Sequence, residues 1–408
     1  MSGPRTLFVT GPGGDGATTV AAATALAAAR AGTDTLLLSP APEDRLAALL
    51  GAAPPPGGAP DGPARVAPGL TAARIDRAAA FRTGVLAAQR RVRPALDLVG
   101  AAVLDDDELT ELPGSGEAAV LGALHAAHAA ADPPRLIVLD LPGAVDAVRL
   151  LALPGQLRRY LRRLLPQERR TARALHPLLA QLAGVPLPAA ALLGAAEGWD
   201  AGLAALEALI AGPDTAARLV LDPTERSAAE LRAARAGLAL HGIAVESVVA
   251  NRLVPVAPAD AWAARLAARQ ESVLTAFVRA ARLPEPHRLP HLGAEPGPAG
   301  LAALPLPPPG PPLRAEPRLT DRRDADGLLV WRLPLPGADR AGLGLVRRGD
   351  ELIVTAGPFR RALPLPAVLR RCTVAGAALA DDGALAVRFA PDPGRWPDAG
   401  SEGSGGPG

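Results

Sequence analysis

A glycine-rich turn between an apolar run and a helical pattern constrains this chain more than any other stretch. The apolar run TLFVT ends at Thr10, the turn GPGGDGATT covers residues 11–19, and VAAATALAAAR follows with helical character. When a strand enters a helix through such a turn, the backbone N–H groups of the helix N-terminus point at an anion. The stretch therefore predicts a phosphate-binding loop at the carboxyl end of a buried strand.

Four further apolar runs alternate with helical stretches behind this loop. The runs are DTLLLS, RLIVLD, ARLVLD and SVVAN, and the helical stretches cover residues 18–31, 77–95, 115–131, 225–241 and 258–281. Short, wholly apolar strands that alternate with helices are typical of parallel sheets covered on both faces. Residues 1–293 are therefore predicted to form an α/β domain with a mostly parallel sheet flanked by helices and with helical insertions.

The composition of the chain changes after this domain. Residues 294–317 are rich in proline and predict a semi-rigid linker. Short strand patterns separated by turns, such as DELIVTA and GALAVRFA, then predict a small all-β sandwich over residues 318–391. The glycine-rich and serine-rich tail, 392–408, is expected to be disordered.

The charged residues restrict the function classes. All 43 basic residues are arginine, and with 41 acidic residues the net charge is only +2, so nucleic acid is not an expected partner. A single cysteine, Cys372, excludes an internal disulfide and any site that needs two thiolates from one chain. No apolar run approaches the roughly 20 residues that span a bilayer, and no signal peptide precedes the first strand, so we expect a cytoplasmic protein.

Two motif templates fit the turn. Read as G-x-G-x-x-G, Gly11, Gly13 and Gly16 match a dinucleotide-binding fingerprint, but the second strand ends in Ser39 without the acidic residue that would hold a ribose hydroxyl. This reading would imply redox chemistry with NAD or NADP.

Read as G-x-x-x-x-G-K-[ST], the same turn matches a P-loop whose lysine position holds Ala17. Thr18 and Thr19 then fit a magnesium ligand and a helix start. We favour the P-loop over both the dinucleotide fingerprint and a plain glycine turn.

The turn resembles the deviant P-loop of the ArsA family, which contains the arsenite-efflux ATPases and the related ATPases that target tail-anchored membrane proteins. The family loop reads K-G-G-x-G-K-T-T, and in this chain Pro12 and Ala17 stand in place of its two lysines. The segment LLLSPAPEDRLAALLG is similar to the family segment that contains D-P-A-H-S, with Ala41 in the position of the catalytic aspartate.

Three later segments extend the resemblance over almost the whole chain. VLDLPGAVDAVRLLALP is similar to a family segment whose aspartate corresponds to Asp140. The run that ends in VVANRLVP closely resembles the family's approach to the adenine-contacting loop, with Asn251 in the position of the base-reading asparagine. DELIVTAGPFRRALPLP resembles the small-heat-shock-like β domain found in many actinobacterial members.

The resemblance implies ATP and Mg²⁺ as cofactors and a homodimer as the assembly, with an unknown protein client or membrane partner. The implied metal ligands are Thr18 and Asp140. The implied cofactor-binding residues are Gly11, Gly13, Gly14, Asp15, Gly16, Ala17, Thr18, Thr19 and Asn251.

Because both loop lysines and the aspartate are replaced, binding is expected to be weak or lost, and we assign no catalytic residue. Since the chain contains no lysine, only an arginine could supply the missing charge, and Arg45 and Arg149 are the candidates. The sequence thus favours a nucleotide-binding or pseudo-ATPase scaffold for protein contacts. The alternative is a slow Mg²⁺-dependent ATPase coupled to membrane-protein targeting or ion transport.

Overall fold

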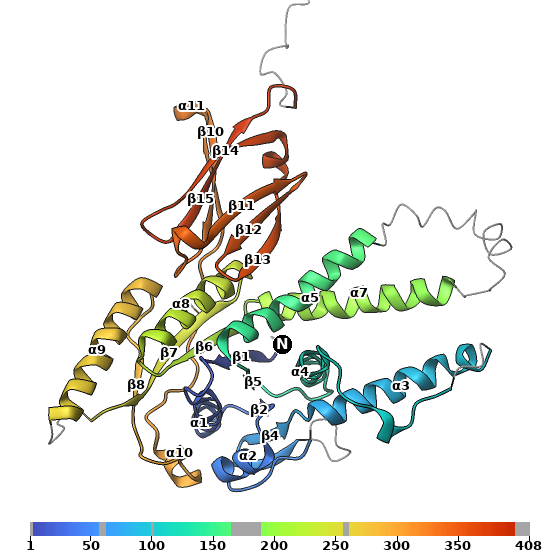
Figure 1. The fold of residues 1–408 in the computed structure, drawn as a ribbon, viewed down its shortest axis with the longest axis vertical. Helices are drawn as coiled ribbons and strands as arrows, with labels where there is room; N and C mark the ends of the chain where they lie inside the picture. Colours follow the sequence, from blue (N-terminus) through green and yellow to red (C-terminus); the bar gives the residue numbers. More distant parts are fainter. Residues whose placement is uncertain are drawn as a thin grey trace, which may run out of the picture.

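A twisted sheet of eight strands forms the centre of the larger domain in the computed structural model (Figure 1). The structure describes residues 3–56, 63–98, 102–164, 189–255, 261–312 and 314–395, so the predicted disordered tail lies outside the described residues from 396 onward. The spatial order is β3-β4-β2-β5-β1-β6-β7-β8, and only β3 pairs antiparallel. The strands are β1 (Arg5–Thr10), β2 (Thr35–Ser39), β3 (Ala64–Ala67), β4 (Leu70–Arg74), β5 (Leu136–Asp140), β6 (Thr215–Leu221), β7 (Ala244–Leu253) and β8 (His287–Pro290).

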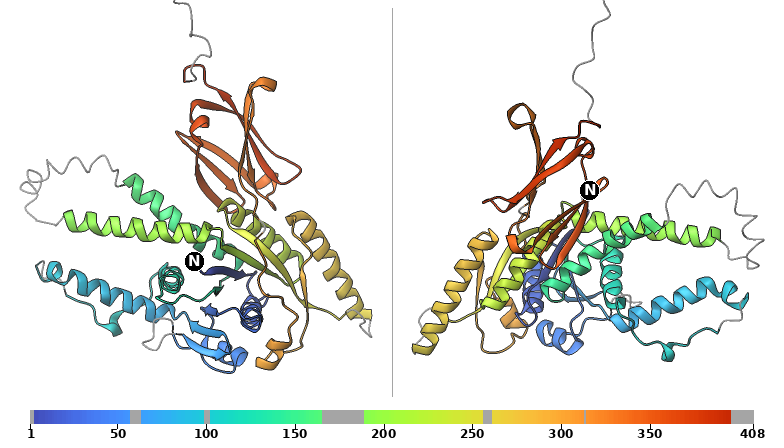
Figure 2. Two further views of the ribbon diagram at one scale, coloured as in Figure 1. Left: turned by 180° about the vertical axis from the view of Figure 1, so that it is seen from behind. Right: turned by 45° about the horizontal axis from the view of Figure 1, so that its top comes forward.

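Helices cover both faces of this sheet, which confirms the predicted mostly parallel α/β architecture (Figure 2). Alternate residues of β1 point to opposite faces, so Phe8 joins the core under α5 and α8 while Val9 joins the core under α1. The helices are α1 (Ala17–Arg30), α2 (Glu43–Leu50), α3 (Arg77–Leu98), α4 (Ser115–His128), α5 (Ala144–Leu164), α7 (Ala189–Ala211), α8 (Glu225–Leu240), α9 (Ala261–Ala281) and α10 (Pro298–Ala303).

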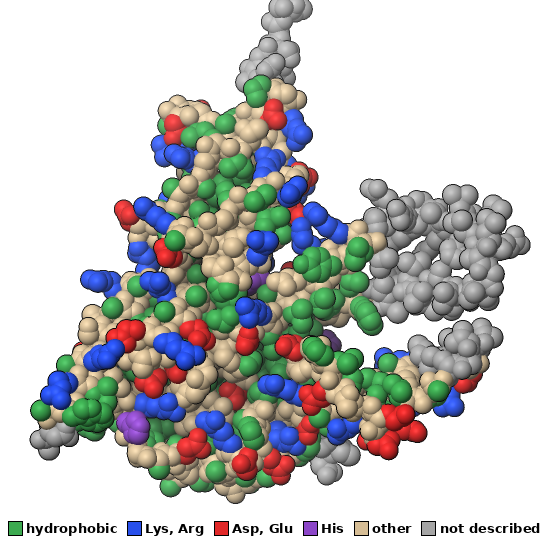
Figure 3. All heavy atoms as spheres, in the orientation of Figure 1, with side chains coloured by type: hydrophobic (Ala, Val, Ile, Leu, Met, Phe, Trp, Pro, Cys, Tyr) green, Lys and Arg blue, Asp and Glu red, His purple; other side chains and the backbone are tan. Residues whose placement is uncertain are grey.

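The α5–α7 pair extends away from the sheet (Figures 1 and 2). Exposed hydrophobic side chains gather on this pair, including Leu157, Tyr160, Leu164 and Trp199. Figure 3 shows apolar atoms in this region. Over the rest of the visible face, charges of both signs are interspersed. None of the helices in the described ranges is long and apolar enough to cross a bilayer.

The C-terminal part consists of two antiparallel sheets, which confirms the predicted all-β fold of this part. One has the order β14-β15-β10-β9 and the other β11-β12-β13. The strands are β9 (Arg318–Arg322), β10 (Leu328–Pro334), β11 (Leu343–Arg348), β12 (Glu351–Ala356), β13 (Phe359–Pro364), β14 (Cys372–Leu379) and β15 (Ala384–Pro391), with the short helix α11 (Arg323–Asp326) after β9. We call this part the β domain.

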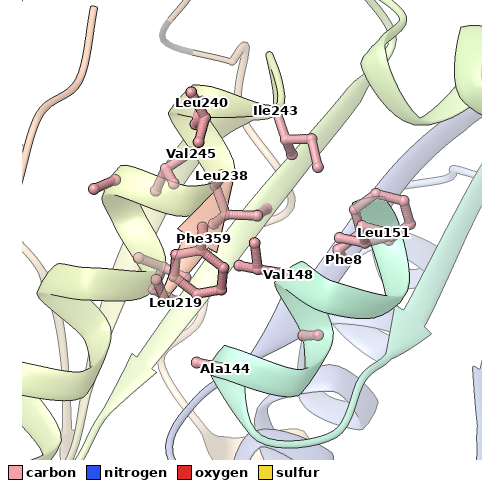
Figure 4. Packing of buried hydrophobic residues seen from close by; sticks show 14 of the residues in the cluster. Phe8, Ala144, Val148, Leu151, Leu219, Leu238, Leu240, Ile243, Val245 and Phe359 are labelled. Carbon is pink, nitrogen blue, oxygen red and sulfur yellow. The ribbon is translucent and has the colours of Figure 1, made fainter. Parts of the chain in front are cut away.

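The β domain packs on α8 through the start of β13. Phe359 is 3% exposed and belongs to the same buried cluster as Leu238 of α8 (Figure 4). The Arg361 guanidinium donates a 2.8 Å hydrogen bond to the carbonyl of Leu240. At the start of β12, the Glu351 carboxylate pairs with Arg159 of α5 at 2.8 Å. The core of the larger domain therefore continues into the β domain.

Residues 294–312, within the stretch expected to be a linker, lie against the larger domain. Leu301 of α10 is 3% exposed and packs in the cluster under α1, and the Arg30 guanidinium donates to the carbonyl of Ala302 at 2.6 Å. Further along, the backbone N–H of Gly310 donates to Glu246 of β7 at 2.8 Å. We call residues 294–312 the strap.

Candidate functional site

The loop of residues 11–16 enters α1 through backbone conformations that require glycine. Gly16, the N-cap of α1, has a φ of 89°, and Gly14 has a φ of 94°. At Gly11 the reason is space, because a Cβ there would lie 2.5 Å from the carbonyl oxygen of Val220. The loop therefore keeps the geometry that aims backbone N–H groups outward from the helix N-terminus.

Asn251 and Asp15 fix the loop to the neighbouring strands. The side-chain amide of Asn251, at the end of β7, donates to the carbonyl of Asp15 at 2.8 Å. The Asp15 carboxylate accepts the backbone N–H of Asp222 at 2.9 Å, and burial raises the pKa of Asp15. The contact is tight, since a Cβ on Gly16 would lie 2.4 Å from Nδ2 of Asn251. The structure thus brings Asn251 directly against the loop.

Thr18 and Asp140 also meet, and Ser39 joins them. Asp140, the last residue of β5, is 3% exposed and accepts a 2.6 Å hydrogen bond from the hydroxyl of Ser39 at the end of β2. The Thr18 hydroxyl is a second hydrogen-bond partner of the same carboxylate, yet burial raises the pKa of Asp140 to about 6. A carboxylate and two hydroxyls are oxygen ligands of the kind that Mg²⁺ takes together with substrate phosphates.

Ser39 was not identified as a site residue from the sequence, where it counted only as a position that lacks an acid. The available signal was its place at the carboxyl end of a buried strand. Its partner became evident only from the pairing of β2 with β5.

A cavity of about 510 Å³ opens beside the loop. Its volume is typical of sites for small molecules, which run from about 300 to 1,000 Å³. Gly16, Thr19 and Asn251 line one part of it, whereas Val254, Leu266, Pro290 and Leu292 supply apolar walls. This lining suits a nucleotide, with phosphates at Gly16 and Thr19 and a base between Asn251 and the apolar walls.

The structure separates the two candidate arginines. Arg45 of α2 lines the cavity. Arg149 of α5 is not among the lining residues and pairs with Asp146 at the surface, where the distance is 3.0 Å and its side chain is 60% exposed. Of the two, Arg45 alone is placed to act on a molecule in the cavity.

The remaining predicted residues belong to the loop but do not line the cavity. Among the described residues, no heavy atom lies within 4 Å of a Cβ built on Gly13, and a Cβ on Gly143 would lie 3.9 Å from the backbone nitrogen of Gly13. Ala17 begins α1 and packs partly buried against the cluster under that helix. Neither residue contributes a side-chain charge, so the loop itself offers only backbone donors and the Thr18 and Thr19 hydroxyls.

Comparisons with known proteins agree with this arrangement. A family model described as anion-transporting ATPase matches residues 4–278, and one described as an HSP20-like domain found in ArsA matches residues 326–389. A protein of Streptomyces coelicolor is 52% identical over 396 residues, which cover 96% of this chain and 99% of the relative.

Two further relatives are more distant. A protein of Mycobacterium tuberculosis is 35% identical over 439 aligned residues, which cover 96% of this chain and 97% of the relative. A protein of Aquifex aeolicus, provisionally named arsenical pump-driving ATPase 1, is 25% identical over 278 residues, which cover 65% of this chain and 69% of the relative.

Proposed function

The chain belongs to the anion-transporting ATPase family, and on that premise we propose that it binds ATP and Mg²⁺ at the loop of residues 11–19 as a pseudo-ATPase scaffold for protein contacts. One observation carries the proposal: the backbone cradle at Gly16 is intact and faces a nucleotide-sized cavity, although its lysine positions hold Pro12 and Ala17. The loop therefore keeps the backbone geometry for binding phosphate but lacks the lysine charges that support catalysis.

Different residues are proposed to bind the phosphates, the Mg²⁺ and the base. Backbone N–H groups of residues 13–18 are proposed to donate to the phosphates, and Thr18 and Asp140 to hold Mg²⁺ through oxygen. Asn251 lies on the cavity wall, where it would contact the base. Bound Mg²⁺ would neutralise phosphate charge, and the buried Asp140 keeps a carboxylate ready for it.

Slow turnover follows from what the loop lacks. Phosphoryl transfer depends on positioning and on charge that stabilises the transition state. Loss of a single preorganised donor typically lowers the rate by about 10² to 10³, and this chain lacks two lysines and the aspartate that Ala41 replaces.

Titration calorimetry with ATP and Mg²⁺ tests the proposal. Wild type should bind with micromolar affinity, and Gly16→Val should not, because its Cβ would collide with Asn251 in a backbone conformation that favours glycine. Thr18→Ala leaves the backbone unchanged and should lose the Mg²⁺-dependent part of the affinity. Gly202→Ala, on α7, is the matched control, because no atom of the described residues lies within 4 Å of a Cβ built there. Absence of ATP binding by the wild type would refute the proposal.

A slow Mg²⁺-dependent ATPase is the second candidate, and the grouping of Thr18, Ser39 and Asp140 favours it. Phosphate release measured over hours would distinguish the two functions. Turnover that disappears in Asp140→Asn and rises in Ala17→Lys would establish an ATPase, for which membrane-protein targeting or ion transport are the proposed roles. If wild type, Asp140→Asn and Ala17→Lys all release phosphate no faster than a reaction without protein, the scaffold is supported.

The proposed assembly is a homodimer, as the family resemblance implies. Light scattering during size-exclusion chromatography should then give a molar mass of twice the 41.3 kDa of one chain.

A further inference from the structure

Arg45 lies between the two parts of the proposed nucleotide site. It belongs to the first turn of α2, which follows β2, and it lines the cavity together with Gly16 and Thr19. It is also close enough to Asp140 for its positive charge to favour the ionised carboxylate. The guanidinium is therefore positioned on the phosphate side of the cavity, next to Thr18 and Asp140.

The partners of Arg45 are few. Its Nη2 lies 3.2 Å from Oε1 of Glu295, and the two side chains are 37% and 59% exposed. Its Nε is buried and has no hydrogen-bond partner among the residues that the structure describes. Exposed ion pairs of this kind change an equilibrium constant by only about fivefold or less. The guanidinium is thus weakly held and retains an unused donor.

The second arginine on the cavity wall, Arg252, lies beside a carboxylate of the same wall. Arg252 follows Asn251 and its guanidinium lies 3.5 Å from the Asp222 carboxylate. Its backbone carbonyl accepts a hydrogen bond from Gln270. Arg252 therefore lies beside Asn251, on the side of the proposed base contact.

We propose that Arg45 is the phosphate-binding cation of this site and that Glu295 occupies it when no nucleotide is bound. The inference rests on the proposed function, because it concerns the same nucleotide. A guanidinium forms paired hydrogen bonds with phosphate as readily as with carboxylate. A nucleotide phosphate carries more charge than Glu295 and meets Mg²⁺ at the same place, so it displaces the carboxylate.

Displacement of Glu295 also affects how the strap is held against α2. Glu295 lies in the strap, and the residues from Pro290 to Pro296 form one wall of the cavity. Pro298, at the start of α10, packs against Gly51 at the end of α2. Nucleotide binding therefore releases one of the contacts that hold the strap against α2.

Calorimetric titration of the full chain with ATP and Mg²⁺ tests Arg45. Arg45→Gln should weaken binding by about 10- to 100-fold, the range for hydrogen bonds to a charged group. Arg45→Lys should lose less, because it restores the charge without the paired geometry. Glu295→Gln should tighten binding by about two- to fivefold, since it removes the competing anion.

Two further variants make the test specific. Arg149→Gln removes an arginine outside the cavity and should leave the affinity within about twofold of wild type. In the double variant Arg45→Gln/Glu295→Gln, the affinity should equal that of Arg45→Gln alone, because Glu295 acts only through Arg45.

The outcomes separate this inference from the proposed function. If Gly16→Val abolishes binding while Arg45→Gln binds like wild type, the nucleotide site stands and Arg45 is not its cation. An equal loss in Arg149→Gln, or a loss in Glu295→Gln, would also overturn the inference, since it would indicate a general or structural effect. If Arg45→Gln does not fold, Glu295→Gln decides: tighter binding supports the exchange and unchanged binding refutes it. A wild type that does not bind ATP refutes both.

Discussion

At the scale of single residues, Asp140 is the position where stability and function are expected to conflict. Burial raises its pKa from 3.8 to about 6, against the opposing effects of its bonds with Ser39 and Thr18. The folded state then binds a proton more tightly than the unfolded state does. The stability that this proton contributes is complete below about pH 4 and is lost as the pH rises through 6. A buried carboxylate kept at such a cost is typical of a binding site.

Asp140→Asn should therefore stabilise the protein near neutral pH. At pH 7.5 the free energy of unfolding should rise by up to about 3 kcal/mol, because about two pKa units of unfavourable ionisation disappear. Near pH 4 the difference from wild type should almost vanish. Urea unfolding at both pH values measures it, with Asp107→Asn at an exposed carboxylate as control. A gain independent of pH would contradict the burial argument. The same variant should lose Mg²⁺-dependent ATP binding.

At the scale of strands and helices, apolar runs were sufficient to predict the central strands β1, β2, β5, β6 and β7, because a sheet covered on both faces leaves little choice of residue. They were insufficient for β3, which is short and has no buried residue, and for β4, whose sequence LTAAR contains two polar residues. They also could not give the order of the strands. The sequence therefore predicted Thr18 and Asp140 as a pair through family resemblance, whereas Ser39 required the sheet itself.

Arg218 shows another limit of sequence patterns. It interrupts the apolar strand β6 and has no exposed surface, yet nothing nearby in the sequence identifies its partner. In the fold its guanidinium donates to Glu246 of the adjacent strand at 2.9 Å and to the carbonyl of Pro307 in the strap at 3.3 Å. Because Glu246 also accepts the N–H of Gly310, one buried ion pair fixes the strap to β6 and β7.

Glu246→Ala should destabilise the protein by about 3 to 5 kcal/mol, since it leaves the Arg218 charge buried without its carboxylate. Chemical denaturation of the two proteins measures the difference. The matched control is Glu271→Ala, which breaks an ion pair with Arg288 in which both side chains are largely exposed, at 54% and 43%, and should change stability by less than about 1 kcal/mol. Similar values for the two variants would show that the buried pair does not hold the strap.

At the scale of the whole molecule, the β domain and the α/β domain share one hydrophobic cluster. The contact is close at Gly237 of α8, where a Cβ would lie 2.5 Å from the ring of Phe359. Arg361 bonds the end of the same helix, and Glu351 bonds α5. Since α5 and α8 both pack on the central sheet, we expect the two domains to unfold together, as one cooperative unit.

Gly237→Ala tests this cooperativity. A methyl group at this position forces the Phe359 ring to move, and overpacking of that kind costs about 1 to 3 kcal/mol. Calorimetry should show a single thermal transition for wild type and, for the variant, an earlier separate transition in which the β domain is lost. Gly202→Ala provides the control. No atom of the described residues lies within 4 Å of a Cβ at this helical glycine of α7, and alanine there should raise stability by up to about 1 kcal/mol. Two transitions already present in wild type would mean that the shared cluster does not couple the domains, and that the β domain folds independently on top of α8.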